Sequence, residues 1–204
     1  MSASTAQRRP RPRKWPRQAR SHETVGVIVE AAARILEERG LAGFSTNAVA
    51  ERAGVSIGSL YQYFPRKEAL IGALIVRETS RLIADAEASR AEPTGTAALS
   101  MLILAAVAHQ LRRPALARLL DFEEARLPLD PDTQQVSNRF RAILSDLLSR
   151  PDLPRQPDPA AAARDVMAII KGMVDAAGIH GETEQQALAS RVGRAVFGYL
   201  NVLA

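Results

Sequence analysis

The sequence contains no cysteine and only three histidines. Without cysteine, a disulfide framework and a thiolate zinc site are both excluded. No two histidines have the spacing of a helical zinc site such as H-E-x-x-H, and no phosphate-binding or dinucleotide-binding glycine motif occurs. We therefore expect no metal and no other cofactor. The lack of cysteine also fits a reducing compartment, so we expect the protein in the cytoplasm.

Long hydrophobic runs are also missing. No apolar run reaches the ~18 residues that a membrane-spanning helix needs. The longest candidate covers about residues 97–108 and stops at His109. The basic start of the chain is not followed by an apolar segment, so it lacks the pattern of a secretory signal. We expect no membrane partner.

The net charge of +5 is concentrated at the start of the chain. Residues 1–20 hold seven cations and no anion, whereas the other 184 residues hold 20 cations against 22 anions. Prolines interrupt this basic arm, and it has no apolar periodicity, so we expect it to be disordered on its own. The arm either contacts DNA, along the phosphates or in the minor groove, or is a solvated tail without a specific role.

Apolar residues make up 47% of the 204-residue chain, which is enough for a sizeable core. They recur at helical spacings of three and four, and no stretch alternates as a β-strand would. The sequence therefore predicts an all-α fold of about nine helices. We expect an arm at residues 1–20, a three-helix head at 21–66 and a larger helical body at 67–204. The expected helices cover about residues 21–39, 46–53, 56–63, 66–90, 96–111, 115–126, 132–150, 160–179 and 183–202.

Two short helices joined by a tight turn are indicated between residues 45 and 64. Ser45 is placed to cap the first of them, because its hydroxyl can accept an amide hydrogen that is free at the helix start. Gly54 tolerates the left-handed conformation that ends helices, and Ser56 is placed to cap the second helix. In the second helix, Leu60 and Phe64 lie four residues apart and are expected to turn inward.

The other face of the second helix has an unusual composition. No acidic residue occurs between Ala53 and Arg66, and the cations Arg66 and Lys67 follow directly. Small residues allow a close approach to another surface, and hydroxyls and amides donate to phosphate oxygens. The pattern is typical of a helix-turn-helix whose second helix enters the DNA major groove, or of a helical hairpin with a partly exposed aromatic patch. The residues expected to face outward are Ile57, Gly58, Ser59, Tyr61, Gln62 and Tyr63.

The run T-N-A-V-A-E-R-A-G-V-S-I-G-S-L-Y-Q-Y-F-P-R-K-E-A-L, residues 46–70, resembles the DNA-binding signature of the TetR family of bacterial transcriptional regulators. The resemblance covers about residues 21–74, roughly a quarter of the chain. It implies a homodimer that places two copies of the second helix in successive major grooves, about 34–36 Å apart, on a near-palindromic operator of double-stranded DNA.

The DNA-binding residues follow from this interpretation. Ile57, Gly58 and Ser59 are expected to approach base edges, and Ile57 offers an apolar contact to a thymine methyl group. Ser56 and Gln62 are also expected to belong to the DNA-binding surface. By resemblance to the family, the residues that hold phosphates are Thr46, Tyr61, Tyr63 and Lys67.

The last two expected helices carry more apolar surface than one helical face needs, which suggests a partner. The resemblance implies the same, because the family dimerises through its last two helices as a four-helix bundle. We therefore expect a homodimer interface at about residues 160–202. The alternative is a core pair of helices within a monomer.

The resemblance also implies a ligand-responsive repressor, released from its operator by a small apolar effector that binds among the helices of the body. The alternative for His109 is a core residue whose hydrogen bonds are made within the protein. The alternative for the methionines is packing in the core without contact to a ligand. The residues expected at the pocket are Met101, Leu104, His109, Phe140, Met167 and Ile170.

Other functions are disfavoured or left open by the sequence. Residues 54–58 spell G-x-S-x-G, the nucleophile elbow of α/β-hydrolases, but that motif requires a preceding strand and none is expected. The alternative to a regulator is a helical small-molecule-binding protein or enzyme, which a convergent pair of carboxylates in the body would favour. We find no such pair and expect no enzymatic activity. An activator, or a regulator without an effector, remains open.

Overall fold

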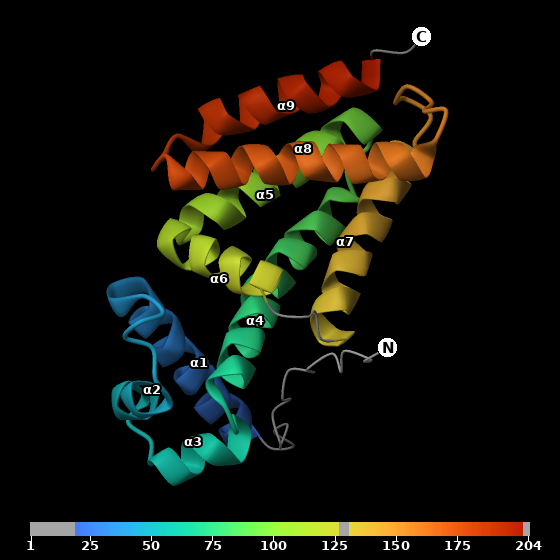
Figure 1. Ribbon diagram of the computed structural model, residues 1–204. Helices are drawn as coiled ribbons and strands as arrows, with labels where there is room; N and C mark the ends of the chain where they lie inside the picture. Colours follow the sequence, from blue (N-terminus) through green and yellow to red (C-terminus); the bar gives the residue numbers. More distant parts are fainter. Residues whose placement is uncertain (1–18, 127–130, 202–204) are drawn as a thin grey trace, which may run out of the picture. The chain divides into compact units, whose positions relative to one another are not determined.

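The computed structural model describes residues 19–126 and 131–201 of the chain. Within these ranges every regular element is an α-helix, which confirms the all-α class, and nine helices are assigned (Figure 1). They are α1 (Ala19–Arg39), α2 (Thr46–Ala53), α3 (Ile57–Tyr63), α4 (Lys67–Ser89), α5 (Gly95–Arg112), α6 (Pro114–Arg126), α7 (Pro131–Leu148), α8 (Pro159–Ile179) and α9 (Gln185–Asn201).

The helix boundaries agree with the expected ones to within a few residues. The first helix begins at Ala19, two residues before its expected start at residue 21. Alanine and arginine are good helix formers, so they extend the helix backwards. The rest of the predicted basic arm lies outside the described residues.

The chain packs as two compact units. Of the described residues, one unit holds 19–77, 115–126 and 131–133, and the other holds 78–114 and 134–201. The boundary falls inside α4, so this single helix belongs to both units. This division by packing differs from the functional division at residue 66, which stays a prediction.

The core of the first unit is formed by the apolar faces of α1, α2, α3, the first turns of α4, and α6. Burial of these faces supplies the main stabilisation, at roughly 25 cal/mol per Å² of apolar surface. Its fully buried larger side chains are Ile28, Ile35, Leu36, Leu60, Phe64, Leu70, Leu74 and Leu116. The helix-turn-helix therefore rests on a packed base of its own.

The second unit is built around α5, which packs against both α8 and α9 (Figure 1). Among the described helices, α5 is the one with the length and composition to cross a membrane, but eight of its residues are buried inside the unit. A helix that is surrounded by other helices in a protein core is also apolar on most sides, because most of its surface is buried. Helices α8 and α9 lie side by side and run in opposite directions (Figure 1).

Candidate nucleic-acid interface

Three local caps define both ends of α2 and the start of α3. The Ser45 hydroxyl accepts the N–H of Ala48 at 3.2 Å, and the Ser56 hydroxyl accepts the N–H of Ser59 at 3.1 Å. Gly54 adopts the left-handed conformation with φ 66°, and its N–H bonds to carbonyls in the last turn of α2. The predicted caps are confirmed, and together they define where each helix begins and the direction in which α3 leaves the turn.

The inward face of α3 is also as predicted. Leu60 and Phe64 are almost completely buried, and Val55 packs half-buried against the same core. Because these side chains anchor α3 to the base of the unit, the opposite face of the helix points to solvent.

The outward face carries most, but not all, of the side chains expected there. Ile57 and Tyr61 keep 39% and 44% of their surface exposed, and Gly58 and Gln62 are exposed as well. Ser59 is half-buried, and Tyr63 is half-buried against the core. The reason for Tyr63 is helical geometry, since a residue three positions after buried Leu60 lies at the edge of the inward face.

Two pairs of hydroxyl groups lie on this surface. Thr46 Oγ1 and the Tyr61 hydroxyl are 3.1 Å apart and join α2 to α3, and Ser56 Oγ and Ser59 Oγ are 2.8 Å apart. In each pair one proton is used in the shared bond, so the other hydroxyl can still donate to an acceptor such as a phosphate oxygen. The structure thus brings together Thr46 and Tyr61, two residues predicted to hold phosphates.

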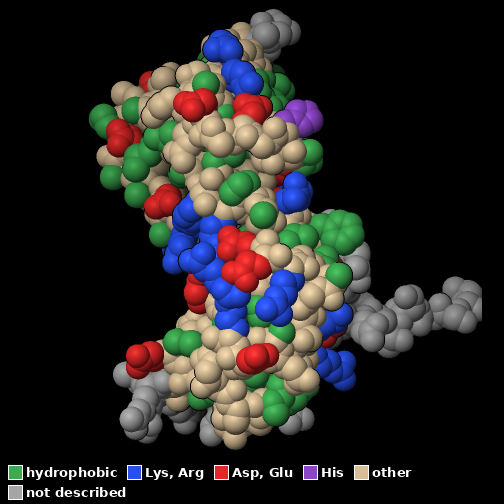
Figure 2. All heavy atoms as spheres, turned by 90° about the vertical axis from the view of Figure 1, so that its left-hand side faces the viewer, with side chains coloured by type: hydrophobic (Ala, Val, Ile, Leu, Met, Phe, Trp, Pro, Cys, Tyr) green, Lys and Arg blue, Asp and Glu red, His purple; other side chains and the backbone are tan. Residues whose placement is uncertain are grey.

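Few charged side chains lie around this surface, and among them are the acidic Glu51 on α2 and Glu68 in the first turn of α4. In the space-filling view, the end of the molecule formed by α2 and α3 shows mainly uncharged side chains and backbone (Figure 2). Arg66 and Lys67 are exposed at the start of α4, and neither forms an ion pair with any described residue. Unpaired cations beside an uncharged, donor-bearing face suit contact with a polyanion.

An ion pair that the sequence did not reveal holds α2 against α1. Arg52 donates two hydrogen bonds to the Glu38 carboxylate, at 2.5 Å and 2.6 Å. These hydrogen bonds lower the pKa of Glu38 and raise the pKa of Arg52 from their usual values. Because the two residues lie 14 positions apart on different helices, only the tertiary packing shows that they meet. Arg52 is thereby a brace for the helix-turn-helix.

A second brace ties α4 to α1. Glu30 accepts from Arg34 on its own helix and from Arg77 on α4, both at 2.9 Å. Arg77 is the last residue that α4 contributes to the first unit. The helix that leaves the head is therefore fixed to α1 by charge as well as by its buried leucines.

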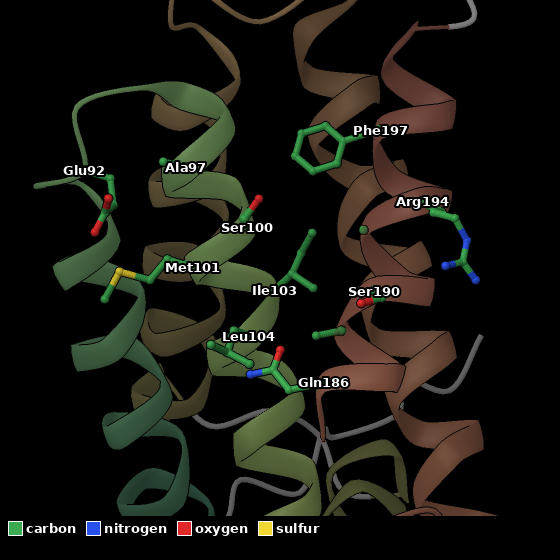
Figure 3. A pocket seen from close by; sticks show the side chains of 12 residues that line it. Glu92, Ala97, Ser100, Met101, Ile103, Leu104, Gln186, Ser190, Arg194 and Phe197 are labelled. Atoms are coloured by element: carbon green, nitrogen blue, oxygen red, sulfur yellow. The ribbon is translucent and has the colours of Figure 1, made fainter. Parts of the chain in front are cut away.

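The side chains predicted for an effector pocket lie at different depths in the second unit. Met101 and Leu104 line an open groove of about 700 Å³ between α5 and α9 (Figure 3). Ile170 is buried in the core, Phe140 and Met167 pack partly buried against that core, and His109 is half-buried on α5. The groove is otherwise lined by Ala97, Ser100, Ile103 and Glu92 on one side and by Gln186, Ala189, Ser190, Gly193, Arg194 and Phe197 on the other.

The groove is mainly apolar, with a few neutral polar groups. Ser100, Ser190 and Gln186 offer hydrogen bonds without a charge, while Arg194 points away from the space between the two helices (Figure 3). No cluster of three or more side chains able to hold a metal ion occurs within the residues that the structure describes.

Comparisons with known proteins agree with this geometry in both units. Residues 28–74 match the model for "Bacterial regulatory proteins, tetR family", and residues 96–200 match the model for "Tetracyclin repressor-like, C-terminal domain". An uncharacterized HTH-type transcriptional regulator of Mycobacterium tuberculosis is 38% identical over 68 residues, which are 33% of this chain and 34% of that protein. The HTH-type transcriptional repressor KstR of Mycolicibacterium smegmatis is 40% identical over 68 residues, 33% of this chain and 32% of that protein. The alignments thus span about a third of the length of these curated relatives.

The fold has close counterparts among solved structures. The fatty acid degradation regulator FadR of Bacillus halodurans superimposes with a TM-score of 0.74 at 18% identity, covering 87% of this chain and 96% of that chain. At this identity the likeness concerns the fold. Since the C-terminal family model alone covers more than half of the chain, the protein belongs to the TetR family of bacterial transcriptional regulators.

Proposed function

We propose that the protein is a ligand-responsive transcriptional repressor that binds a near-palindromic DNA operator as a homodimer in the bacterial cytoplasm. The observation that carries this proposal is the exposed face of α3, which is uncharged and rich in hydroxyl groups. Arg66 and Lys67, which form no ion pair within the part of the chain that the structure describes, follow it. The similar protein KstR is named a repressor, and the match to the family of bacterial regulatory proteins covers residues 28–74, which hold this face. The relatives are regulators, which favours a role without enzymatic activity.

The exposed residues divide by position into two roles. Ile57 and Gly58 lie at the start of α3, where recognition helices meet base edges, with Ser56, Ser59 and Gln62 beside them. Thr46, Tyr61 and Lys67 surround them and hold phosphates, which sets the register on the duplex. Tyr63 contributes only the part of its ring and hydroxyl that the core leaves free.

The homodimer is supported by the outward faces of α8 and α9. Gly172 and Gly198 are exposed in the interior of these helices, and a Cβ added at either would meet nothing within 4 Å. Glycine in a helix interior costs about 1 kcal/mol of stability relative to alanine. Because the space around Gly172 and Gly198 would admit a Cβ, packing within the chain does not explain why glycine occurs at these positions. A second copy of the chain does, because glycine lets two helices approach closely. The small residues on these faces are Ala161, Ala168, Gly172, Ala176, Ala187, Ala195 and Gly198.

The proposed effector is a small, mainly apolar molecule that binds the second unit. The groove with Met101 and Leu104 has a volume in the usual range for ligand sites. Most of its lining is apolar, Ser100, Ser190 and Gln186 add neutral polar groups, and the charged residues Glu92 and Arg194 complete it. The other predicted pocket residues, His109, Phe140, Met167 and Ile170, stay a prediction for an effector that enters the body more deeply.

Selection of bound duplexes from a random pool tests the function directly. We expect an enriched motif of two inverted half-sites whose centres lie one or two helical turns apart, about 10–10.5 base pairs each. Binding to the motif should weaken steeply as the salt concentration rises. Enrichment of no motif, together with weak binding that does not depend on salt, would refute the proposal.

A further inference from the structure

The loop of residues 149–158, between α7 and α8, contacts the ends of four helices of the second unit. We propose that Arg150 and Asp152 in this loop are positioning residues for DNA binding, which fix the end of α4 to the α8–α9 pair and so set the half-site spacing that the dimer accepts. The inference rests on the proposed function, because it concerns a dimer on two half-sites.

Arg150 binds the chain where α4 ends. One guanidinium nitrogen donates to the carbonyl of Glu92 and another to the carbonyl of Arg90, both at 2.6 Å. These carbonyls directly follow the last turn of α4, which ends at Ser89. The planar guanidinium presents its donors in a fixed fork, so two simultaneous bonds define the direction of the segment and not only its distance.

Asp152 binds the start of the next helix. Its carboxylate accepts the N–H of Gly95 at 2.9 Å and the N–H of Thr96 at 3.1 Å, the first two residues of α5. These bonds lower the pKa of Asp152, with the Gly95 bond as the largest cause. A carboxylate at a helix N-terminus is favourable both as an acceptor and by the helix dipole. The Arg150 and Asp152 side chains thus hold the two sides of the turn between α4 and α5.

Close packing prevents this turn from sliding past the loop. Gly95 is buried, and a Cβ added to it would lie 2.9 Å from Leu153 Cγ and 3.0 Å from both Arg150 Cβ and Asp152 Oδ1. Only glycine fits here, because any side chain would push the loop and the turn apart.

The same loop also holds both helices of the proposed dimer interface. Asp158 caps α8 by accepting the N–H groups of Ala160 and Ala161 at 3.0 Å. Gln156 donates to the carbonyl of Leu200, near the end of α9, at 3.0 Å. Prolines at positions 151, 154 and 157 fix the backbone φ of the loop, which makes it a stiff connection between these helices and the α4–α5 turn.

The other charged contacts near the end of α4 are weaker candidates for this role. Arg90 pairs with Glu87 and Asp146, and Arg139 pairs with Glu87 at 2.9 Å. These pairs join one surface side chain to another and contribute little, whereas Arg150 and Asp152 bond to the backbone of the turn. Arg139 therefore offers a matched control in the same unit.

The positioning role follows from the continuity of α4. The helix runs without interruption from Lys67 in the first unit to Ser89 in the second. Fixing its last turn to the start of α8 restricts the directions that its first turns can take. Loss of the Arg150 and Asp152 bonds should therefore widen the range of head separations in the dimer, even where each head still folds and binds DNA.

The test uses the full chain on a panel of duplexes that carry the same two half-sites at different spacings. The variants are Arg150→Lys, Arg150→Met and Asp152→Asn, with Arg139→Gln as the control. We expect the wild type and R139Q to favour one spacing strongly. In D152N and R150M the ratio of affinities between the best and the next-best spacing should fall at least about fivefold, with a smaller fall in R150K.

The outcomes separate this inference from the proposed function. A wild type without any spacing preference would overturn both. A wild type that discriminates, with variants that bind every spacing equally more weakly or keep the wild-type ratio, would overturn the positioning role alone, because a purely structural defect lowers affinity uniformly. If R150M does not fold, D152N and R150K give the decision.

Discussion

Lys67 opens α4 with its side chain in solvent and without an ion pair to any described residue. It lies beside the hydroxyl-bearing face of α3 but outside it, so its expected contact is a phosphate and not a base. Contacts of this kind add affinity on every sequence and release counterions.

Lys67→Ala should therefore weaken binding to operator and random duplexes alike. The slope of log affinity against log salt concentration should decrease by about 1. Fluorescence anisotropy at several salt concentrations measures both. Arg139→Ala is the control, because Arg139 is an exposed cation on α7 in the second unit and lies on neither helix of the proposed dimer interface. An unchanged slope in K67A would show that Lys67 does not contact the backbone.

Gly54 determines the conformation of the turn between α2 and α3. Its φ of 66° is strained for a residue with a Cβ, while the space around it is open. Gly54→Ala should lower the free energy of unfolding by about 1 kcal/mol through backbone strain alone.

Gly26→Ala is the matched control for this substitution. Gly26 lies inside α1, also has nothing within 4 Å of an added Cβ, and has no positive φ. The control should stabilise by about 0.5–1 kcal/mol, since alanine is the better helix former. Denaturant unfolding measures both variants, and equal signs of the two changes would contradict the strain argument.

At the scale of elements, the Glu38–Arg52 pair joins α1 to α2, and its contribution depends on pH. The pKa of Glu38 is lower in the folded protein than its usual value, because Arg52 hydrogen-bonds to the ionised carboxylate. A group with a lowered folded pKa stabilises above its unfolded pKa, and this contribution is lost as pH falls through the folded pKa.

Glu38→Gln should therefore be less stable than the wild type at pH 7 and should approach it as pH falls below about 4, near the unfolded pKa of glutamate. Thermal unfolding from pH 7 to pH 3 gives the difference curve. Glu37→Gln on the same helix serves as the comparison for a general charge effect. A difference that grows on acidification would mean that the pair does not stabilise the ionised form.

At the scale of the whole molecule, the dimer should respond to bulk on the exposed glycines. Gly198→Leu places a large side chain on the outward face of α9, where we propose that a second copy approaches closely. The variant should dissociate into monomers at concentrations where the wild type is dimeric. Because the operator is bound by the dimer, its affinity for the operator should fall as well. Sedimentation velocity measures the oligomeric state.

Gly193→Leu tests whether position on α9 matters. Gly193 lies on the same helix but lines the groove against α5, and a Cβ there also meets nothing within 4 Å. The variant should remain dimeric. If both variants dissociate equally, or neither does, the proposed interface is on another face.

The sequence by itself determined the class of the fold, the order of the helices and the ends of α2 and α3. These features depend on interactions within about four residues: the caps of Ser45 and Ser56, the left-handed Gly54, and the spacing of Leu60 and Phe64. Their signals are therefore visible in a short stretch of chain, and so was the uncharged face that follows from them.

The tertiary structure alone decided which distant residues meet. It brought Arg52 to Glu38 and placed α6 in the first unit, together with α2 and α3. It also left Tyr63 half-buried against the core of that unit. It also joined the 149–158 loop, in sequence only a proline-rich connection, to the α4–α5 turn across more than fifty residues. The physical reason is that such contacts depend on the directions in which whole helices pack, and no local pattern in the chain encodes those directions.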